Sequence, residues 1–259
     1  MDWDALVVRA GDQVTGWGRL VSNAQGTWFD PPVPVPLVMI IPPPVRAPSA
    51  GGVPVTGADF AAVSDRYELG RDVEGWATVT GIWTGSELRI QRQSPRRPEA
   101  DPGPRWDTPP CPVPPGGWPH GTNGRDQDNL DFDLGDLEQT GAAVTVVTFR
   151  PGAGQAVLVI AATDPQAVEA RLRPQLGQRL CVVSSRWTKP DLDRVHGHLR
   201  ARWDDWKLHS LAVAVAEDAQ ARVTADLARV LPPTASWAAT LPRGILRLNP
   251  WLLPARAGA

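Results

Sequence analysis

The fold of the N-terminal part is decided by residues 76–90, which read WATVTGIWTGSELRI. The pair Gly85-Ser86 suits a two-residue type II′ turn, which places Trp83 opposite Leu88. Alternation along the two strands then makes one face apolar, with Trp83 on it, and leaves the opposite face for other side chains. The stretch therefore predicts a half-buried β-hairpin. The face opposite its core side carries Trp76, Thr78, Thr80 and Arg89.

Further strands are predicted on the N-terminal side of this hairpin. Residues 13–21 and 34–41 have strand-like patterns, and the second is confined to a sheet edge because Pro34 and Pro36 lack amide donors. Five or so short strands in about 95 residues are typical of a small barrel, OB-like before SH3-like, or of a small sandwich. We therefore expect an all-β domain over residues 1–94.

A change in composition separates this domain from the rest of the chain. Residues 95–119 contain ten Pro, and an acidic stretch follows at 126–138. Such a segment favours extended polyproline II over helix or central strand. We expect a Pro-rich and acidic linker or strap over residues 95–140.

The C-terminal part, residues 141–259, mixes strands and helices. The predicted order is ββαβαββαβ, which indicates an α+β sandwich with ferredoxin-like elements, in which helices pack mainly on one face of a mixed sheet. Asp164 with Pro165 starts the first helix, and Thr188 with Asp191 forms a capping-box-like start for the second. The predicted strands are 144–149, 155–162, 179–184, 211–216, 221–230 and 244–248, with a short helix at 234–241.

The second helix carries one apolar stripe, whose members recur at spacings of three and four. The stripe predicts a helix of about five turns. Its members are Leu192, Val195, Leu199, Trp203 and Trp206.

Charge and composition exclude several classes of protein. The formal net charge of −2, with 26 basic and 28 acidic residues, makes non-specific nucleic-acid binding unexpected, although a local basic groove stays possible. The N-terminus lacks the pattern of a secretory signal, and the apolar runs are too short to span a bilayer. Two Cys make no disulfide framework, and Cys181 is expected to be an inert buried thiol. We therefore expect a reduced, cytoplasmic protein without a membrane span.

No set of side chains predicts catalysis, a metal or a cofactor. His196 and His198 point about 200° apart on a helix and cannot hold one ion together. The six carboxylates between Asp126 and Glu138 lack the Gly and the terminal Glu of an EF-hand loop. Ser184 and Ser185 lie at a strand end but outside a nucleophile elbow, and no phosphate-binding loop occurs. We therefore expect no catalytic residues, no metal and no cofactor.

The twelve Trp are the remaining functional signal. Indole faces stack on bases, sugars or Pro rings, so a ligand face on the β-domain is one prediction. Trp106 and Trp118 flank the Pro-rich stretch, which is either a docking peptide for a partner or a strap on the protein's own surface. The predicted ligand residues are Trp17, Trp28, Trp76 and Arg89.

Three functions remain open from the sequence. The first is a non-enzymatic binding or scaffold protein that acts through protein–protein contacts or self-association. The second is a binder of oligosaccharide or single-stranded nucleic acid through the aromatic residues of the β-domain. The third is an enzyme with a site between the domains, built on Ser184, Ser185, Arg186 or His209.

Overall fold

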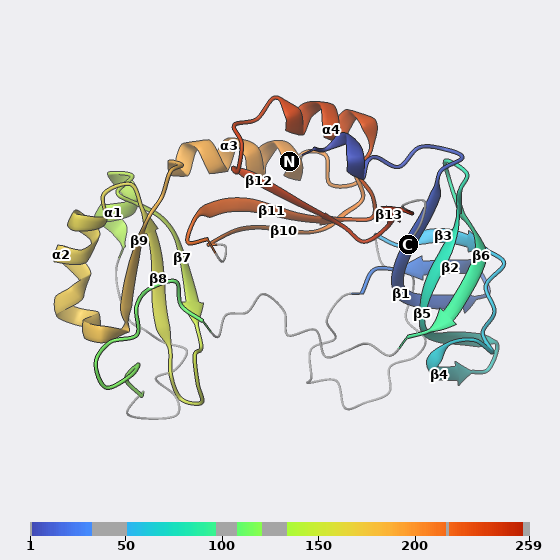
Figure 1. Ribbon diagram of the computed structural model, residues 1–259, viewed down its shortest axis with the longest axis horizontal. Coiled ribbons are helices and arrows are strands. Elements are labelled where there is room, and N and C mark those ends of the chain that lie inside the picture. The colour runs from blue at the N-terminus through green and yellow to red at the C-terminus, as the bar shows by residue number, and fades with distance from the viewer. Residues whose placement is uncertain (1, 33–50, 97–107, 121–133, 216–217, 256–259) are drawn as a thin grey trace.

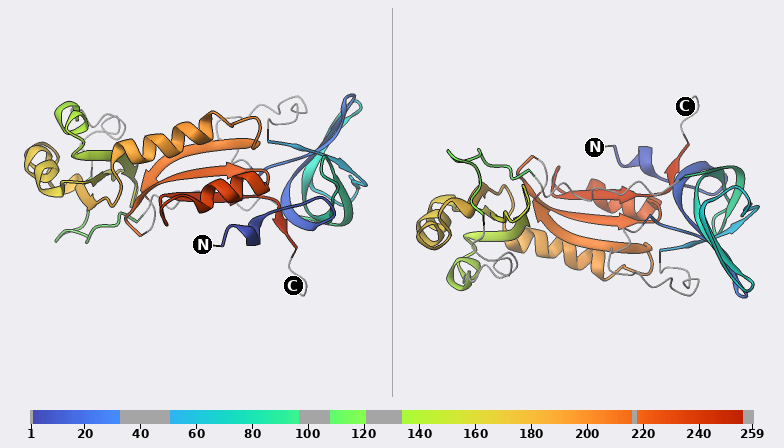
Figure 2. Two further views of the ribbon diagram at one scale, coloured as in Figure 1. Left: turned by 90° about the horizontal axis from the view of Figure 1, so that it is seen from above. Right: turned by 90° about the horizontal axis from the view of Figure 1, so that it is seen from below.

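The computed structural model describes residues 2–32, 51–96, 108–120, 134–215 and 218–255. These residues form an α+β structure with three sheets, as the sequence predicted for the fold class. The seven-stranded sheet lies at one end of the molecule, a three-stranded sheet under α3 and α4 in the middle, and a second three-stranded sheet with α2 at the other end (Figures 1 and 2). None of the helices in these ranges is long and apolar enough to cross a membrane.

The strands of the N-terminal sheet pair in a cycle. β1 pairs with β2, β2 with β3, β3 with β6, β6 with β5, and β5 again with β1; only the β3–β6 pair is parallel. β4 and β13 extend this cycle at β5 and β1. The strands are β1 (Gln13–Asn23), β2 (Gly26–Asp30), β3 (Val53–Thr56), β4 (Ser64–Leu69), β5 (Asp72–Trp83), β6 (Leu88–Pro95) and β13 (Leu253–Pro254).

The predicted hairpin is confirmed as β5 and β6. Trp83 pairs with Leu88, and Thr84 donates its amide proton to Glu87 O at 2.9 Å. Gly85 has a φ of +109°, which suits the first central position of a turn of this kind. Along β5 every second side chain is buried, so the strand has one core face and one outer face. The predicted strand 13–21 is also confirmed, whereas 34–41 lies outside the described residues.

The C-terminal part consists of two ββαβ units rather than the single mixed sheet that we expected. In each unit two antiparallel strands are followed by a helix and a third strand that is parallel to the second. No hydrogen-bonded ladder joins the edge strands of the two units, so each unit has a three-stranded sheet of its own. The first unit is β7 (Ala143–Phe149), β8 (Val157–Ala162), α2 (Pro165–Leu176) and β9 (Leu180–Ser184). The second is β10 (Leu208–Val215), β11 (Ala221–Leu227), α4 (Pro232–Ala239) and β12 (Leu246–Pro250).

Short local signals place the helices as the sequence predicted. Asp164 accepts a hydrogen bond from the amide of Ala167 and caps α2. Thr188 and Asp191 form a full capping box at the start of α3 (Lys189–Arg200), which connects the two units. Single-turn helices occur at η1 (Asp4–Leu6) and η2 (Gly177–Arg179), and α1 (Gly135–Gln139) precedes β7.

The predicted five-turn helix is shorter than expected, because α3 ends at Arg200. The chain continues through turns with bonds such as Arg202 N to Leu199 O, which are one residue tighter than α-helical bonds. These turns still bury Trp206 with the stripe of α3. They end where Leu208 N donates to Trp203 O at 3.0 Å, the long bond of a Schellman motif.

Lys207 occupies the left-handed position of this motif, with a φ of +51°. A side chain with a Cβ is unfavourable there, whereas Gly adopts the conformation without strain. We expect Lys207→Gly to raise the free energy of unfolding by about 1 kcal/mol. Denaturant unfolding measures the change. Arg171→Gly, in the interior of α2, is the control and should lower the same quantity by about 1 kcal/mol.

The hydrophobic core has three parts, and residues distant in the sequence contribute to the same part. One lies inside the N-terminal sheet, one lies between α2 and the sheet β7–β9, and the largest connects both ββαβ units through α3 and α4. Trp3 and Leu6 pack against this largest part, and Leu252 is buried in the N-terminal one. The guanidinium of Arg229, just after β11, lies 4.0 Å from the ring centre of Trp83. The N-terminal residues therefore pack against the C-terminal part of the protein, and the C-terminal residues pack against the N-terminal sheet.

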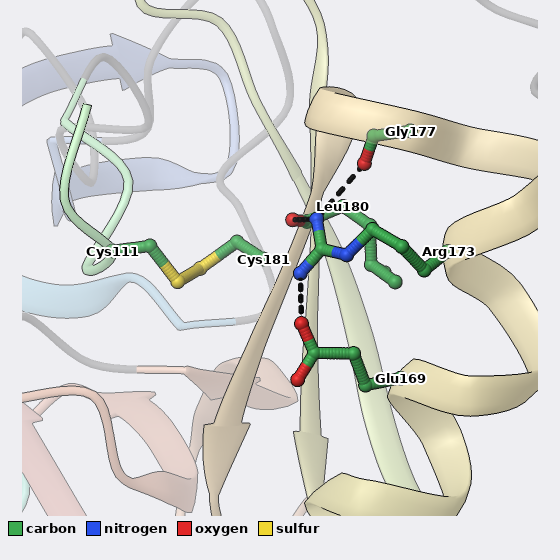
Figure 3. The surroundings of a disulfide bond; sticks show 6 residues. All are labelled: Cys111, Glu169, Arg173, Gly177, Leu180 and Cys181. Atoms are coloured by element: carbon green, nitrogen blue, oxygen red, sulfur yellow. Dashed lines mark hydrogen bonds and ion pairs between the residues drawn. A yellow bond between two sulfur atoms is a disulfide. The ribbon is translucent and has the colours of Figure 1, made fainter. Parts of the chain in front are cut away.

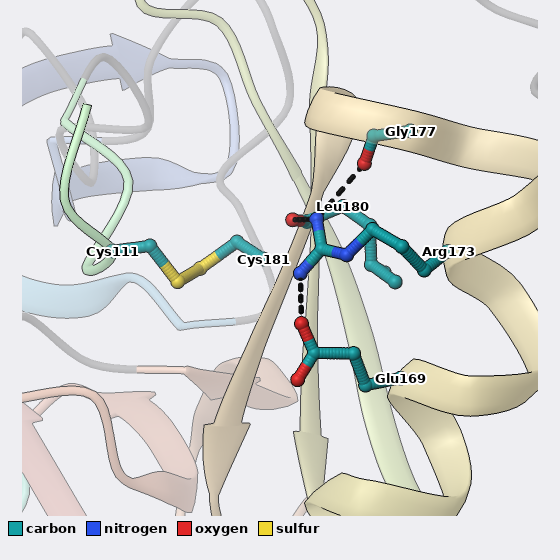
Figure 4. A network of polar contacts seen from close by, with 6 residues as sticks. All are labelled: Cys111, Glu169, Arg173, Gly177, Leu180 and Cys181. Carbon is teal, nitrogen blue, oxygen red and sulfur yellow. Dashed lines mark hydrogen bonds and ion pairs between the residues drawn. A yellow bond between two sulfur atoms is a disulfide. The ribbon is translucent and has the colours of Figure 1, made fainter. Parts of the chain in front are cut away.

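The structure corrects the expectation for the two cysteines. Cys111 and Cys181 form a disulfide across 70 residues (Figure 3). It attaches segment 108–120 to β9, where the sequence predicted an inert thiol. On α2 beside β9, Arg173 donates to Gly177 O and Leu180 O, both at 2.9 Å, and pairs with Glu169 (Figure 4). Because disulfides persist mainly in oxidising compartments, this bond weighs against the predicted cytoplasmic location, which stays a prediction.

Candidate functional site

The outer face of β1, β5 and β6 is the candidate site. Side chains of paired residues point to the same side of a sheet, so the strand register gives the rows on this face. Trp17 lies beside Thr78 and Ser94, and Thr15 lies beside Thr80 and Arg92. A hydrogen bond from Thr80 Oγ1 to Thr15 Oγ1, at 3.3 Å, confirms that these two side chains share the face.

Two tryptophans lie together at the centre of this face. Trp17 of β1 and Trp76 of β5 are diagonal neighbours, with ring centres 6.1 Å apart and planes tilted by 38°. Both side chains are partly exposed. The guanidinium of Arg96, directly after β6, lies 4.5 Å from the ring centre of Trp17. Two indole rings and one guanidinium group thus lie in contact, as in sites where aromatic side chains stack on the planar groups of a ligand.

Three arginines lie on or directly after β6, on the same face as the two tryptophans. Arg89 lies opposite Ile82, Arg92 opposite Thr80, and Arg96 follows the end of the strand. None of these arginines has a carboxylate within ion-pair distance in the part of the chain that the structure describes. The face therefore carries uncompensated positive charge, although the net charge of the chain is −2.

Arg19 on the same face contrasts with these arginines. Its guanidinium donates to Asp30 at 2.9 Å on β2 and to Glu74 at 3.1 Å on β5. Asp30 is only 2% exposed, so this cluster is enclosed. Paired charges of this kind hold neighbouring strands together, whereas the arginines of β6 keep their donors available to a ligand.

The structure places three of the four predicted ligand residues on one face and brings two of them, Trp17 and Trp76, into contact. Trp17, Trp76 and Arg89 belong to the face just described; along the strands, the row of Arg89 is four residues from that of Trp17, roughly 13 Å, and six residues from Trp76, roughly 20 Å. Trp28 of β2 pairs with Val21, so it lies beyond Arg19 on the other side of β1. It is a neighbour of the face rather than a part of its centre.

Sequence reasoning missed Arg92, Arg96 and Thr15. The β-bulge in the ladder between Thr80 and Gly81 shifts the register, so that Arg92 pairs with Thr80. The simple alternation from Leu88 would have placed Arg92 on the core side. The dense basic pattern of residues 89–97, with four arginines and no acid, was the available signal.

The two predicted partner-docking residues have different outcomes. Trp118 is 7% exposed and packs into the largest core cluster, and its carbonyl accepts a hydrogen bond from Gln155 Nε2 at 2.8 Å. Trp106 lies outside the described residues. The indole of Trp118 therefore anchors its own segment to the protein.

The groups considered for catalysis do not meet. Ser184 lies beside the turn between β10 and β11, since Gln220 Nε2 donates to its carbonyl at 3.3 Å. His209 lies at the opposite end of β10, about 20 Å away at the rise of a strand. Ser185 Oγ donates to Trp187 O at 2.7 Å and is buried.

His198 and His209 are packing residues in the structure. His198 stacks on Trp237 with ring centres 4.1 Å apart, and burial, aided by the charge of Arg202, lowers its pKa. Burial also lowers the pKa of His209. Within the described ranges, no group of three His, Cys, Asp or Glu residues could hold a metal ion. Asp126 to Asp133 lie outside those ranges.

The outer face of β1, β5 and β6 thus combines aromatic stacking surface with free cationic donors. Comparisons of the chain with family models, with curated proteins and with solved structures find no match.

Proposed function

We propose that this is a non-enzymatic binding protein whose N-terminal sheet is an OB-like barrel that binds single-stranded nucleic acid. The pairing cycle supports the barrel: five strands return to β1, with only the β3–β6 pair parallel. OB folds are partly open five-stranded barrels that bind oligonucleotides and oligosaccharides. The two ββαβ units support the α+β class that we propose for the C-terminal part.

The observation that carries the ligand class is the row of Arg89, Arg92 and Arg96 along β6, on the same face of the sheet as Trp17 and Trp76. Single-stranded nucleic acid offers bases for the indoles and phosphates for the guanidinium groups at the same time. A neutral oligosaccharide would stack on the tryptophans but would leave three unpaired arginines without a role. An acidic polysaccharide satisfies the charges and is therefore a defined alternative outcome of the test.

The small net negative charge of the chain does not favour non-specific binding to phosphates. A strongly basic surface would bind duplex and single strand alike through phosphates. Here the cationic side chains of β6 lie on the same face as the two indoles, which add a preference for unstacked bases. We therefore propose a preference for single strands over duplex of the same length.

The test is a titration of a fluorescently labelled single-stranded 15-nucleotide oligomer, followed by anisotropy at low salt. We expect binding whose log K falls with log salt with a slope of about −2, since three phosphate contacts each contribute about 0.7. Trp76→Ala should weaken binding by about 10-fold or more, because one stacked base contributes about 1–3 kcal/mol.

Two charge variants test the role of the arginines, one on the proposed face and a matched control on α2. The double variant Arg92→Ala/Arg96→Ala should reduce the salt slope by about 1.4, whereas Arg171→Ala, exposed on α2, should leave it unchanged. Unfolding curves of each variant show whether the fold is retained. Absence of binding to single strands, or tighter binding to heparin with no dependence on Trp76, would reject the proposed ligand.

A further inference from the structure

The Pro-rich segment 108–120, here called the strap, is fixed to the protein at two points. The disulfide joins Cys111 to Cys181, which is fully buried on β9. Seven residues later Trp118 is buried, and next to it His120 forms a bridge with Gln155. The strap lies beside the sheet β7–β9, at the end of the molecule opposite the N-terminal sheet (Figure 1).

Between these two anchors the strap is exposed. Val113 is 65% exposed, and Pro112 and Pro115 are also exposed, whereas Pro114 is partly buried. Val113 exceeds Leu69 and Leu253, the other large apolar side chains recorded as exposed in the described residues. Val113 therefore stands between two exposed prolines on a segment that is held at both ends, where a partner can reach it.

The exposed residues have the spacing of a polyproline ligand. Polyproline II has three residues per turn, so Pro112 and Pro115 lie on one ridge, as in a PxxP motif. The ridge ends at a turn in which Gly117 N donates to Pro114 O at 2.9 Å, with Gly116 at a φ of +90°. A Pro followed by a Gly of positive φ is typical of a type II turn, whose first central residue keeps an extended backbone.

We propose that Pro112–Pro115 is a docking peptide for the aromatic-lined groove of a partner protein, and that the disulfide and Trp118 present it. Grooves of this class bind PxxP segments because the peptide is already extended and loses little entropy. The strap has no charged residue between Thr108 and His120. The groove that fits it therefore recognises proline rings and Val113 and makes no ion pair with these residues.

The anchors increase the expected affinity. A free peptide of this composition would have to be ordered on binding, whereas the strap is held at both ends. This inference is independent of the nucleic-acid face, which lies on other strands. It combines the two predictions for the strap: Trp118 packs on the protein, and the middle of the strap is the part proposed to contact a partner.

The test uses the full-length oxidised chain and a panel of purified SH3 and WW domains, whose grooves bind PxxP segments. We expect at least one domain to bind, measured by titration calorimetry. Val113→Asp should weaken that binding by about 30-fold or more, as for a residue at the centre of an interface. Reduction of the disulfide, or Cys111→Ala, should weaken it by about 10-fold through lost preorganisation.

Leu69→Asp, at the tip of the β4–β5 hairpin, is the matched control and should leave the affinity unchanged. Val113 is exposed, so its substitution is not expected to affect folding, and the unfolding curve checks this. If no domain of the panel binds the oxidised chain, or if Val113→Asp binds as tightly as the wild type, the docking role is wrong. Oligonucleotide binding in the same samples reports separately on the proposed function.

Discussion

The variant Cys111→Ala is expected to lose about 4 kcal/mol of unfolding free energy, the value for a disulfide that closes a loop of this length. The bond joins residues 70 apart, so its loss restores a large conformational freedom to the unfolded chain. The substitution falls on a partly exposed residue of the strap, so it creates little cavity of its own. Guanidinium-induced unfolding under non-reducing conditions measures the change.

Two controls separate the bond from the side chain. Wild-type protein with a reducing agent should approach the stability of Cys111→Ala, and the variant itself should not respond to the agent. A wild-type protein whose Cys111 reacts with a thiol reagent in the native state, and whose stability is the same in both conditions, would contradict the bond. The buried thiol of Cys181 in the variant should be inert toward thiol reagents until the protein unfolds.

The features that sequence predicted best are the ones that depend on a few neighbouring residues. The turn at Gly85-Ser86 determines the β5–β6 register, and Thr188 with Asp191 determines the start of α3. In both cases the interacting groups are within three or four residues, so the local pattern contains the physical cause.

The features that the sequence could not predict depend on distant contacts. Nothing near Cys111 or Cys181 indicates that the strap crosses β9, because that contact arises from the packing of the whole unit. The separation of the two ββαβ units is similar: the order of elements was predicted, but sheet membership depends on which edges form ladders. Pairing of distant strands carries no short sequence signal.

The candidate site could be predicted in part, because some of its residues follow from local alternation and others depend on distant pairing. Alternation along β5 placed Trp76 on the face away from Trp83, as the burial pattern now shows. The contact between Trp17 and Trp76 needed the β1–β5 register, and the position of Arg92 needed the bulge in β6. The residue types of the site could therefore be predicted from the sequence, but their arrangement required long-range pairing.

Gly18→Ala is expected to destabilise the N-terminal sheet by about 3 kcal/mol, the upper part of the range for overpacking. Gly18 lies on the inner side of β1, where a Cβ would be 2.1 Å from Asp30 O and 3.2 Å from the Phe29 ring. The first of these atoms belongs to the backbone of the paired strand β2 and can move only if the β1–β2 ladder moves with it. Because the same part of β1 also pairs with β5, the shift would disturb the pairing cycle on both sides.

A second glycine is the matched control for this variant. Gly197, within α3, has no neighbour within 4 Å of an added Cβ and no positive φ, so Gly197→Ala meets open space. Because Ala forms helix better than Gly, that variant should gain up to about 1 kcal/mol. Opposite signs for the same Gly→Ala change, measured by denaturant unfolding, would show that β1 needs a glycine for the close approach of β2. Equal effects of the two substitutions would instead mean that β1 and β2 are not packed as closely as the structure has them.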